Sequence, residues 1–288
     1  MTALVRLYPA AYRREFGDEI SEAFREATRE AGTPARVREG ADVLGHALRM
    51  RLGLGSGGRA GRLLAALAPF ALIAVGASAL SWAGVMRSAL FSAEPGEVGP
   101  AFAALVAAYL VTVLGAFLGL AGRWSAGSWI ALAGVVAQLA AGAPRMGVGG
   151  MVLFAGPMLV LALVAVACPP DVRPAARIRT GTGVVAAMTW AVVLMGTVMV
   201  VPLSYPLTQL RFVVPVAAGL LLTGRQGFAR LRTAPAVLLA GLPFLFLGGW
   251  PGTVEPLVLA GLLVLLLAAA ATVGVRRRRG ARDPLVGS

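Results

Sequence analysis

The chain of 288 residues is 58% hydrophobic and only 14% charged, with a mean hydropathy of +0.80, and a soluble domain of this size could not bury so much apolar surface. Its formal net charge is +13 and all 26 basic residues are arginines, which we attribute to codon bias in a GC-rich bacterial genome. Because these arginines lie mostly at the ends of long apolar stretches, they indicate the positive cytoplasmic loops of a membrane protein, and we expect no nucleic-acid partner.

Residues 1–52 predict a small cytoplasmic helical domain. Tyr12, Phe16, Ile20 and Phe24 recur at every fourth position and give an amphipathic helix one apolar stripe. A second helix follows, with an apolar side formed by Val37, Ala41, Leu44 and Leu48. The two helices can pack as a hairpin, but so small a core needs a third surface, which can be the bilayer interface, the membrane domain or a partner. The stripe of the first helix is therefore a candidate partner-binding face, and the Gly-rich residues 53–62 predict a hinge.

A sequence pattern in this segment resembles a known bacterial one. Leu7, Tyr8 and Pro9 lead into an Arg-rich turn, then the pair Phe16 and Gly17, then acidic residues before an apolar one. Similar segments, called permease prefix domains, precede the membrane part of some ABC-type permeases and of many uncharacterised multi-pass proteins of high-GC bacteria. The likeness extends to about residue 52, and it implies a location and a general class without carrying over a substrate or a site residue. The membrane part departs from the permease pattern, because no large domain interrupts its outer loops.

Eight apolar stretches follow, and each predicts a transmembrane helix because a bilayer core takes about 20 residues. They cover residues 63–86, 101–121, 128–143, 151–168, 184–203, 207–223, 234–250 and 256–275. Residues 63–275 are thus predicted to form the transmembrane domain, and residues 276–288 a basic cytoplasmic tail. The expected fold class is all-α: a polytopic membrane bundle of about eight helices behind a small amphipathic helical hairpin.

The charges between the stretches predict how the chain crosses the membrane. One side would carry the N-terminal arginines together with Arg123, Arg173, Arg177, Arg179, Arg225, Arg230, Arg232, the run 276–279 and Arg282. The other side would carry Arg87 and Arg145 as its only arginines, beside Glu94, Glu97 and Glu255. Eight spans with both termini in the cytoplasm satisfy the positive-inside rule at every connector, whereas an odd number would expose one arginine cluster.

The longest inner connector, residues 169–183, divides the spans into two four-helix halves, 63–168 and 184–275. Weak likenesses between the halves, such as Ala131-Leu132-Ala133-Gly134 with Leu238-Leu239-Ala240-Gly241, are compatible with a parallel repeat. Chance similarity is the other explanation, because an alphabet of Ala, Leu, Val and Gly matches itself easily.

No catalytic or cofactor-binding constellation is present in the sequence. His46 is the only His and Cys168 the only Cys, which argues against a zinc site and against a His-based triad within the spans. Without Lys there is no phosphate-binding loop of an ATPase, and no carboxylate lies inside a predicted span. We therefore expect a protein that is not an enzyme and that holds no metal or cofactor.

Three polar residues form the candidate intramembrane site. Arg211 is the one ionisable residue within a predicted span, Gln209 lies beside it, and Gln138 lies in the third span. Arg211 can instead extend to the outer headgroups, and Gln138 can instead join two helices by a hydrogen bond. Gly115 and Gly119 form a GxxxG pattern, which predicts close helix packing.

Aromatic residues near the predicted span ends are candidate interface anchors. Trp124, Tyr205 and Trp250 fall at such ends, and Tyr8, Trp82, Trp129 and Trp190 are further candidates.

Two functions remain open at this point. One is a permease-like membrane component of a transport system that relies on a separate ATP-binding subunit. The other is a signalling or regulatory membrane protein whose N-terminal hairpin binds a cytosolic regulator. Both place the chain in the bacterial cytoplasmic membrane with the lipid bilayer as its main partner.

Overall fold

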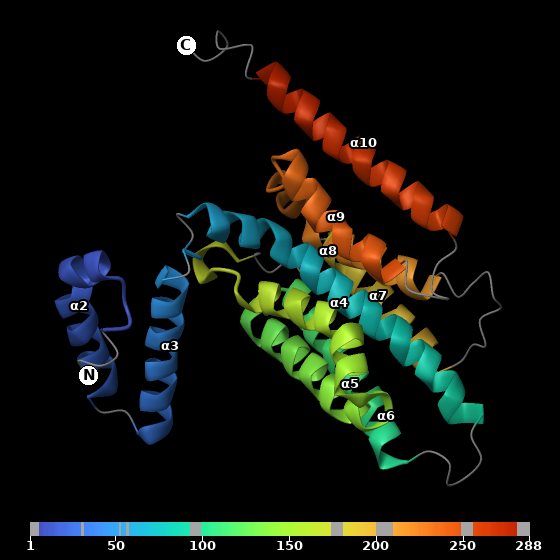
Figure 1. Ribbon diagram of the computed structural model, residues 1–288, viewed down its shortest axis with the longest axis horizontal. Coiled ribbons are helices and arrows are strands. Elements are labelled where there is room, and N and C mark those ends of the chain that lie inside the picture. Colours follow the sequence, from blue (N-terminus) through green and yellow to red (C-terminus); the bar gives the residue numbers. More distant parts are fainter. Residues whose placement is uncertain are drawn as a thin grey trace. The chain divides into compact units, whose positions relative to one another are not determined.

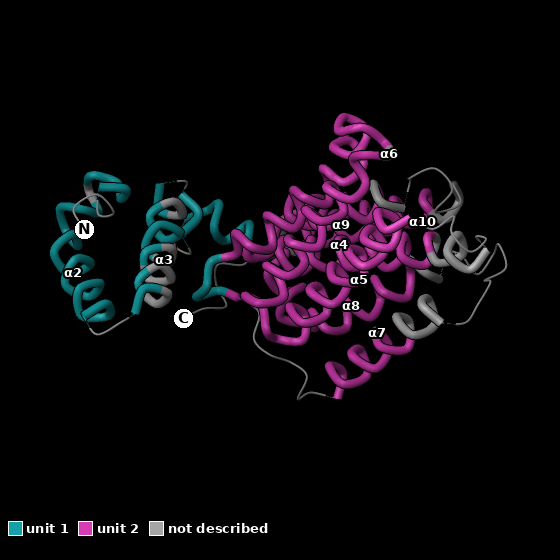
Figure 2. The backbone as a smooth tube through the Cα atoms, turned by 90° about the horizontal axis from the view of Figure 1, so that it is seen from below, with its two compact units in different colours: residues 1–64, 169–172 teal, residues 65–168, 173–288 magenta. Residues whose placement is uncertain are grey.

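The computed structural model describes residues 6–29, 32–51, 53–55, 58–92, 99–173, 181–199, 210–248 and 256–280. Within these ranges every regular element is helical and no strand occurs, which confirms the predicted all-α class (Figure 1). The contacts divide the chain into two compact units, one of residues 1–64 with 169–172 and one of residues 65–168 with 173–288 (Figure 2). Each unit is described by itself.

The first unit contains the helices α2 (Ala10–Thr28) and α3 (Thr33–Arg51), residues 59–64 of the helix that follows, and the short 3-10 helix η1 (Pro170–Val172). Pro9 occupies the N-cap position of α2, where its missing N–H costs no helical hydrogen bond. The two helices pack against each other, as the apolar stripes predict.

The second unit begins within α4 (Arg59–Ser92) and continues through α5 (Pro100–Leu120) and α6 (Trp124–Val166). Helix α6 is two legs in one, because Gly147 inside it is non-helical, with φ 70° and ψ 157°. A positive φ is a conformation that glycine adopts without steric cost, so the chain can turn back here. The two legs correspond to the third and fourth predicted spans.

The remaining helices are α7 (Gly181–Met199), α8 (Leu210–Ala229), α9 (Ala234–Gly248) and α10 (Pro256–Gly280). Helix α7 packs along α8, and α9 packs along α10. Gly224, with φ 58°, interrupts α8 in the same way as Gly147 interrupts α6. The last turn of α8 is thereby set off from the rest of the helix.

Among the described residues, four helical segments are long and apolar enough to cross a membrane: Arg59–Gly84, Pro100–Leu120, Trp124–Pro144 and Met146–Val166. Four shorter apolar segments follow, Gly181–Val192, Val213–Ala229, Ala234–Leu245 and Leu259–Val275. Each predicted span overlaps one of these apolar helical segments, although residues 200–203, 207–209 and 249–250 of the predicted spans lie outside the described residues. The third is longer than predicted, because the helix starts at Trp124 rather than at residue 128.

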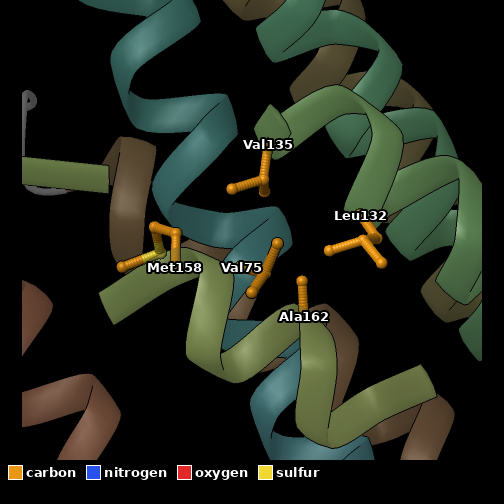
Figure 3. Packing of buried hydrophobic residues seen from close by; sticks show 5 residues of the cluster. All are labelled: Val75, Leu132, Val135, Met158 and Ala162. Atoms are coloured by element: carbon orange, nitrogen blue, oxygen red, sulfur yellow. The ribbon is translucent and has the colours of Figure 1, made fainter. Parts of the chain in front are cut away.

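Helix α4 is the central helix of the second unit. Of its most apolar stretch 83% is buried by other parts of the protein, whereas the other three long segments are 28–39% buried. A helix that is apolar all round suits such a position. Val75 of α4 packs with Leu132 and Val135 of the first leg of α6 and with Met158 and Ala162 of the second leg (Figure 3).

Helices α5 and α6 approach each other through small residues. A methyl group added at Gly115 would lie 2.8 Å from Ala131 Cα, and one added at Gly134 would lie 3.0 Å from the Ala108 carbonyl oxygen. Gly119 likewise lies against Gly127. The GxxxG pattern of the sequence therefore serves close packing of helices within this chain.

Candidate functional site

Gln138 joins two helices in the interior of the second unit. Its side chain is 3% exposed, and its Nε2 donates a hydrogen bond of 2.7 Å to Thr112 Oγ1 of α5. The Thr112 hydroxyl in turn donates to the Ala108 carbonyl at 2.9 Å. The hydroxyl accepts one bond and donates another, so this arrangement satisfies it. Thr112 is not among the predicted site residues, although a Thr within an apolar helix is a sign of such a partner.

Of the three residues of the predicted intramembrane site, only Gln138 has its side chain within the described residues. Arg211 lies in the first turn of α8, but its side chain lies outside the described residues, as does the whole of Gln209. The described contact of Gln138 is with Thr112. Of the two interpretations of Gln138, the geometry supports an interhelical hydrogen bond.

The candidate partner-binding face, formed by Tyr12, Phe16, Ile20 and Phe24, is half-buried along its whole length. Its N-terminal half belongs to an aromatic cluster of the first unit. The ring centroids of Tyr12 and Phe16 are 4.9 Å apart, and Tyr12 stacks on Tyr8 at 5.4 Å with an angle of 19° between the rings. The ring centroid of Tyr12 also lies 6.1 Å from that of His46 in α3, so this end of the stripe contributes to the packing of the hairpin. Ile20 and Phe24 form the half-exposed remainder of the stripe.

Tyr8 connects the segment that precedes α2 to α3 by side-chain contacts. Its ring is buried, its hydroxyl donates to the Val43 carbonyl at 3.4 Å, and His46 Nδ1 lies 3.0 Å from the same oxygen. One hydroxyl proton serves one acceptor, so with the proton on the Val43 bond His46 is the donor of the second bond. Arg51 adds a bond from its guanidinium to the Arg6 carbonyl at 3.2 Å. The Tyr of the Leu-Tyr-Pro pattern therefore has a structural role in closing the hairpin.

Arg230 donates from Nη1 to the Ala65 carbonyl of α4 at 3.3 Å. In a continuous helix that carbonyl would accept the N–H of the residue four positions later, which here is Pro69 and has no N–H. The guanidinium thus satisfies a carbonyl that the proline leaves unpaired. Phe228, two residues earlier, packs edge-to-face on Phe70 at 5.5 Å and 70°.

Trp124 likewise donates to a carbonyl that a proline leaves unpaired, at the end of α6. Its indole Nε1 donates to the Ala165 carbonyl at 3.1 Å, and the residue four positions after Ala165 is Pro169. The prediction that Trp124 anchors the chain at a membrane interface is wrong in its physical basis, because the side chain is 3% exposed and packs inside the unit. Trp190 is equally buried, and its indole Nε1 has no hydrogen-bond partner among the described residues.

The turn between α8 and α9 carries three arginines whose side chains the structure describes. Arg225 and Arg232 are exposed and Arg230 is half-buried. The Asp and Glu residues of the second unit all fall outside its described ranges. Within these ranges no side-chain carboxylate of the unit therefore pairs with the two exposed guanidinium groups.

The described residues contain no group of three or more His, Cys, Asp and Glu side chains that could hold a metal ion. Comparison of the chain with protein-family models, with curated proteins and with solved structures gives no match.

Proposed function

We propose that the chain is an integral protein of the bacterial cytoplasmic membrane with eight transmembrane helices and both termini in the cytoplasm. The observation that supports it best is the contrast between a buried central helix α4 and the large apolar side chains exposed on the helices around it. Among them are Val152 and Leu153 on α6, Met188 on α7 and Leu265 on α10. Exposed apolar surface of this extent needs a lipid or protein cover.

A topology test uses the single Cys of the chain. After Cys168→Ala, new cysteines at Gly40, Gly149 and Gly181, where added side chains meet open space, are treated in intact cells with a membrane-impermeant maleimide. We expect labelling of Gly149→Cys alone, and labelling of the other two only after the cells are opened. Labelling of Gly40→Cys or Gly181→Cys in intact cells would contradict the proposed orientation.

The proposed activity is that of a permease-like membrane component of a transport system, with a separate ATP-binding subunit as its partner. Its support is the combination of a compact helical unit carrying the Leu-Tyr-Pro pattern with a bundle whose described polar contacts are used in packing. In the absence of a phosphate-binding loop, an energy source would have to come from another chain.

Purification of the full chain from native membranes in mild detergent tests this activity. We expect an ATP-binding protein to copurify, and to be lost from the variant Ile20→Ser/Phe24→Ser, which changes the half-exposed part of the stripe. Glu22→Ser is the control, because Glu22 is an exposed position of the same helix that falls off the apolar stripe. Recovery of no ATP-binding protein under several mild detergents would contradict the proposal.

The alternative function, a regulatory membrane protein, rests on the same separate N-terminal unit. Deletion of residues 1–52 distinguishes the two. Loss of a transcriptional response with solute efflux intact supports regulation, whereas loss of efflux supports transport.

A further inference from the structure

We propose that the turn between α8 and α9 binds the phosphate headgroup of an anionic phospholipid through Arg225 and Arg232. The proposal rests on the membrane placement proposed above, which puts this turn at the cytoplasmic leaflet. It adds a specific ligand and two specific residues to that placement.

The turn is held in place by two contacts with α4. Arg230 donates to the Ala65 carbonyl at 3.3 Å, and Phe228 packs on Phe70 with ring centroids 5.5 Å apart. Both partners, Ala65 and Phe70, are buried. The backbone between residues 225 and 232 is thus attached at two points to the central helix, which reduces the conformational entropy that a ligand must remove on binding.

The two arginines that remain are presented outward. Arg225 and Arg232 are exposed, and the described part of the unit offers them no carboxylate. Arg232 donates from its Nε to the carbonyl of Ala229, three residues earlier, at 3.4 Å. That bond does not involve its two terminal nitrogens. A guanidinium fork matches two oxygens of one phosphate, which makes arginine suited to a phosphodiester.

Apolar surface beside the arginines favours a lipid over a soluble anion or an acidic protein. Phe228 is 47% exposed and Leu221 is 48% exposed, although Phe228 lies only two residues from Arg230 and three from Arg225. An anionic lipid offers both parts that this surface needs, a phosphate for the guanidinium groups and an acyl chain for the apolar residues. Basic surfaces at the cytoplasmic ends of helices are sites of this kind in membrane proteins.

The test uses the purified full chain in a neutral detergent, with native mass spectrometry to count retained lipids. The probes are phosphatidylglycerol and phosphatidylcholine with identical acyl chains. We expect the chain to retain phosphatidylglycerol in preference. Each Arg→Gln change should weaken this binding about five-fold, and Arg225→Gln/Arg232→Gln about twenty-fold. Arg123→Gln is the matched control, since it removes the same charge from an exposed position of the α5–α6 turn, and we expect less than a two-fold change.

Several outcomes would overturn the proposal. They are equal retention of the two lipids by the wild-type chain, unchanged phosphatidylglycerol binding in the double variant, and an equal loss of that binding in Arg123→Gln. Displacement of the lipid by inorganic phosphate at low millimolar concentration would indicate a soluble anion as the ligand. An acidic protein that copurifies with the wild-type chain and is lost from the double variant, with lipid retention unchanged, would indicate a protein partner. Cysteine labelling separates this failure from that of the topology. If Gly181→Cys lies inside and the double variant still retains phosphatidylglycerol, the lipid site alone is wrong.

Discussion

The hydrogen bond from Arg230 to the Ala65 carbonyl gives a quantitative prediction, because it compensates for Pro69. We expect Arg230→Met, which keeps an apolar stem and removes the donor, to lower the free energy of unfolding by about 1.5–3 kcal/mol, the range for a hydrogen bond to a charged group. In a Pro69→Ala background the N–H of residue 69 can bond to the same carbonyl. The loss caused by Arg230→Met should then be smaller by about 1 kcal/mol or more, since the carbonyl is no longer left unpaired.

The measurement is a double-mutant cycle on the detergent-solubilised full chain, by reversible unfolding or, where unfolding is irreversible, by the shift of the thermal midpoint. The cycle removes the effects that Pro69→Ala and Arg230→Met have separately, including any other contact of Arg230 that does not involve residue 69. Arg232→Met is the control, because its bond reaches only the Ala229 carbonyl next to it. Its effect should be the same in both backgrounds. A coupling energy between residues 69 and 230 within about 0.3 kcal/mol of zero would refute the reasoning.

Three further predictions use the same stability assay. Gly76→Val should destabilise the bundle by about 2 kcal/mol or more, because a Cβ at Gly76 would lie 2.7 Å from Ala116 Cβ and 2.9 Å from the Trp190 ring; Gly261→Val, which meets open space, should change stability by less than about 0.5 kcal/mol, and equal effects would contradict the packing. Gln138→Leu should cost about 0.6 kcal/mol and at most about 1.7 kcal/mol, the mean and the maximum for interhelical hydrogen bonds in a membrane protein, and no measurable loss would show that its bond to Thr112 contributes nothing. Trp124→Phe keeps an aromatic ring and removes the N–H that meets the Ala165 carbonyl, so a loss of about 1–3 kcal/mol is expected, and full stability of the variant would argue against that bond.

The positions of the helices could be predicted from the sequence because apolar length and loop charge are local signals. The breaks at Gly147 and Gly224 fall between predicted spans, where Gly147 follows Arg145 by two residues and Gly224 directly precedes Arg225. The central position of α4 could not be predicted in this way. Its composition hardly differs from that of its neighbours, and its burial depends on which other helices pack around it.

The candidate site shows the same division between local and tertiary information. Gln138 could be identified as a polar residue in an apolar helix, but its partner Thr112 is 26 residues away and is selected by the register of α5 against α6. That register depends in turn on the small residues at the contact, including Gly134, which lies against Thr112. A side chain at this position would separate the helices and remove the hydrogen bond.

The prolines of the chain indicate where backbone carbonyls need hydrogen-bond donors from elsewhere in the fold. A proline within or just after an apolar helix removes the N–H that the carbonyl four residues earlier would accept, and in a low-dielectric interior that carbonyl needs another donor. Pro69 and Pro169 therefore predict that Ala65 and Ala165 need donors, although they do not say which. The donors are Arg230 and Trp124, and both come from residues at or beside the connectors between apolar helices. A donor side chain at a connector can stay hydrated until the helices pack, and then enters the bundle only at the end of a helix. A donor in the middle of a helix would have to lie within the apolar core. Arginine and tryptophan residues at the connectors can therefore donate to carbonyls that a proline leaves without an N–H partner, in addition to their usual roles as loop charges and interface anchors.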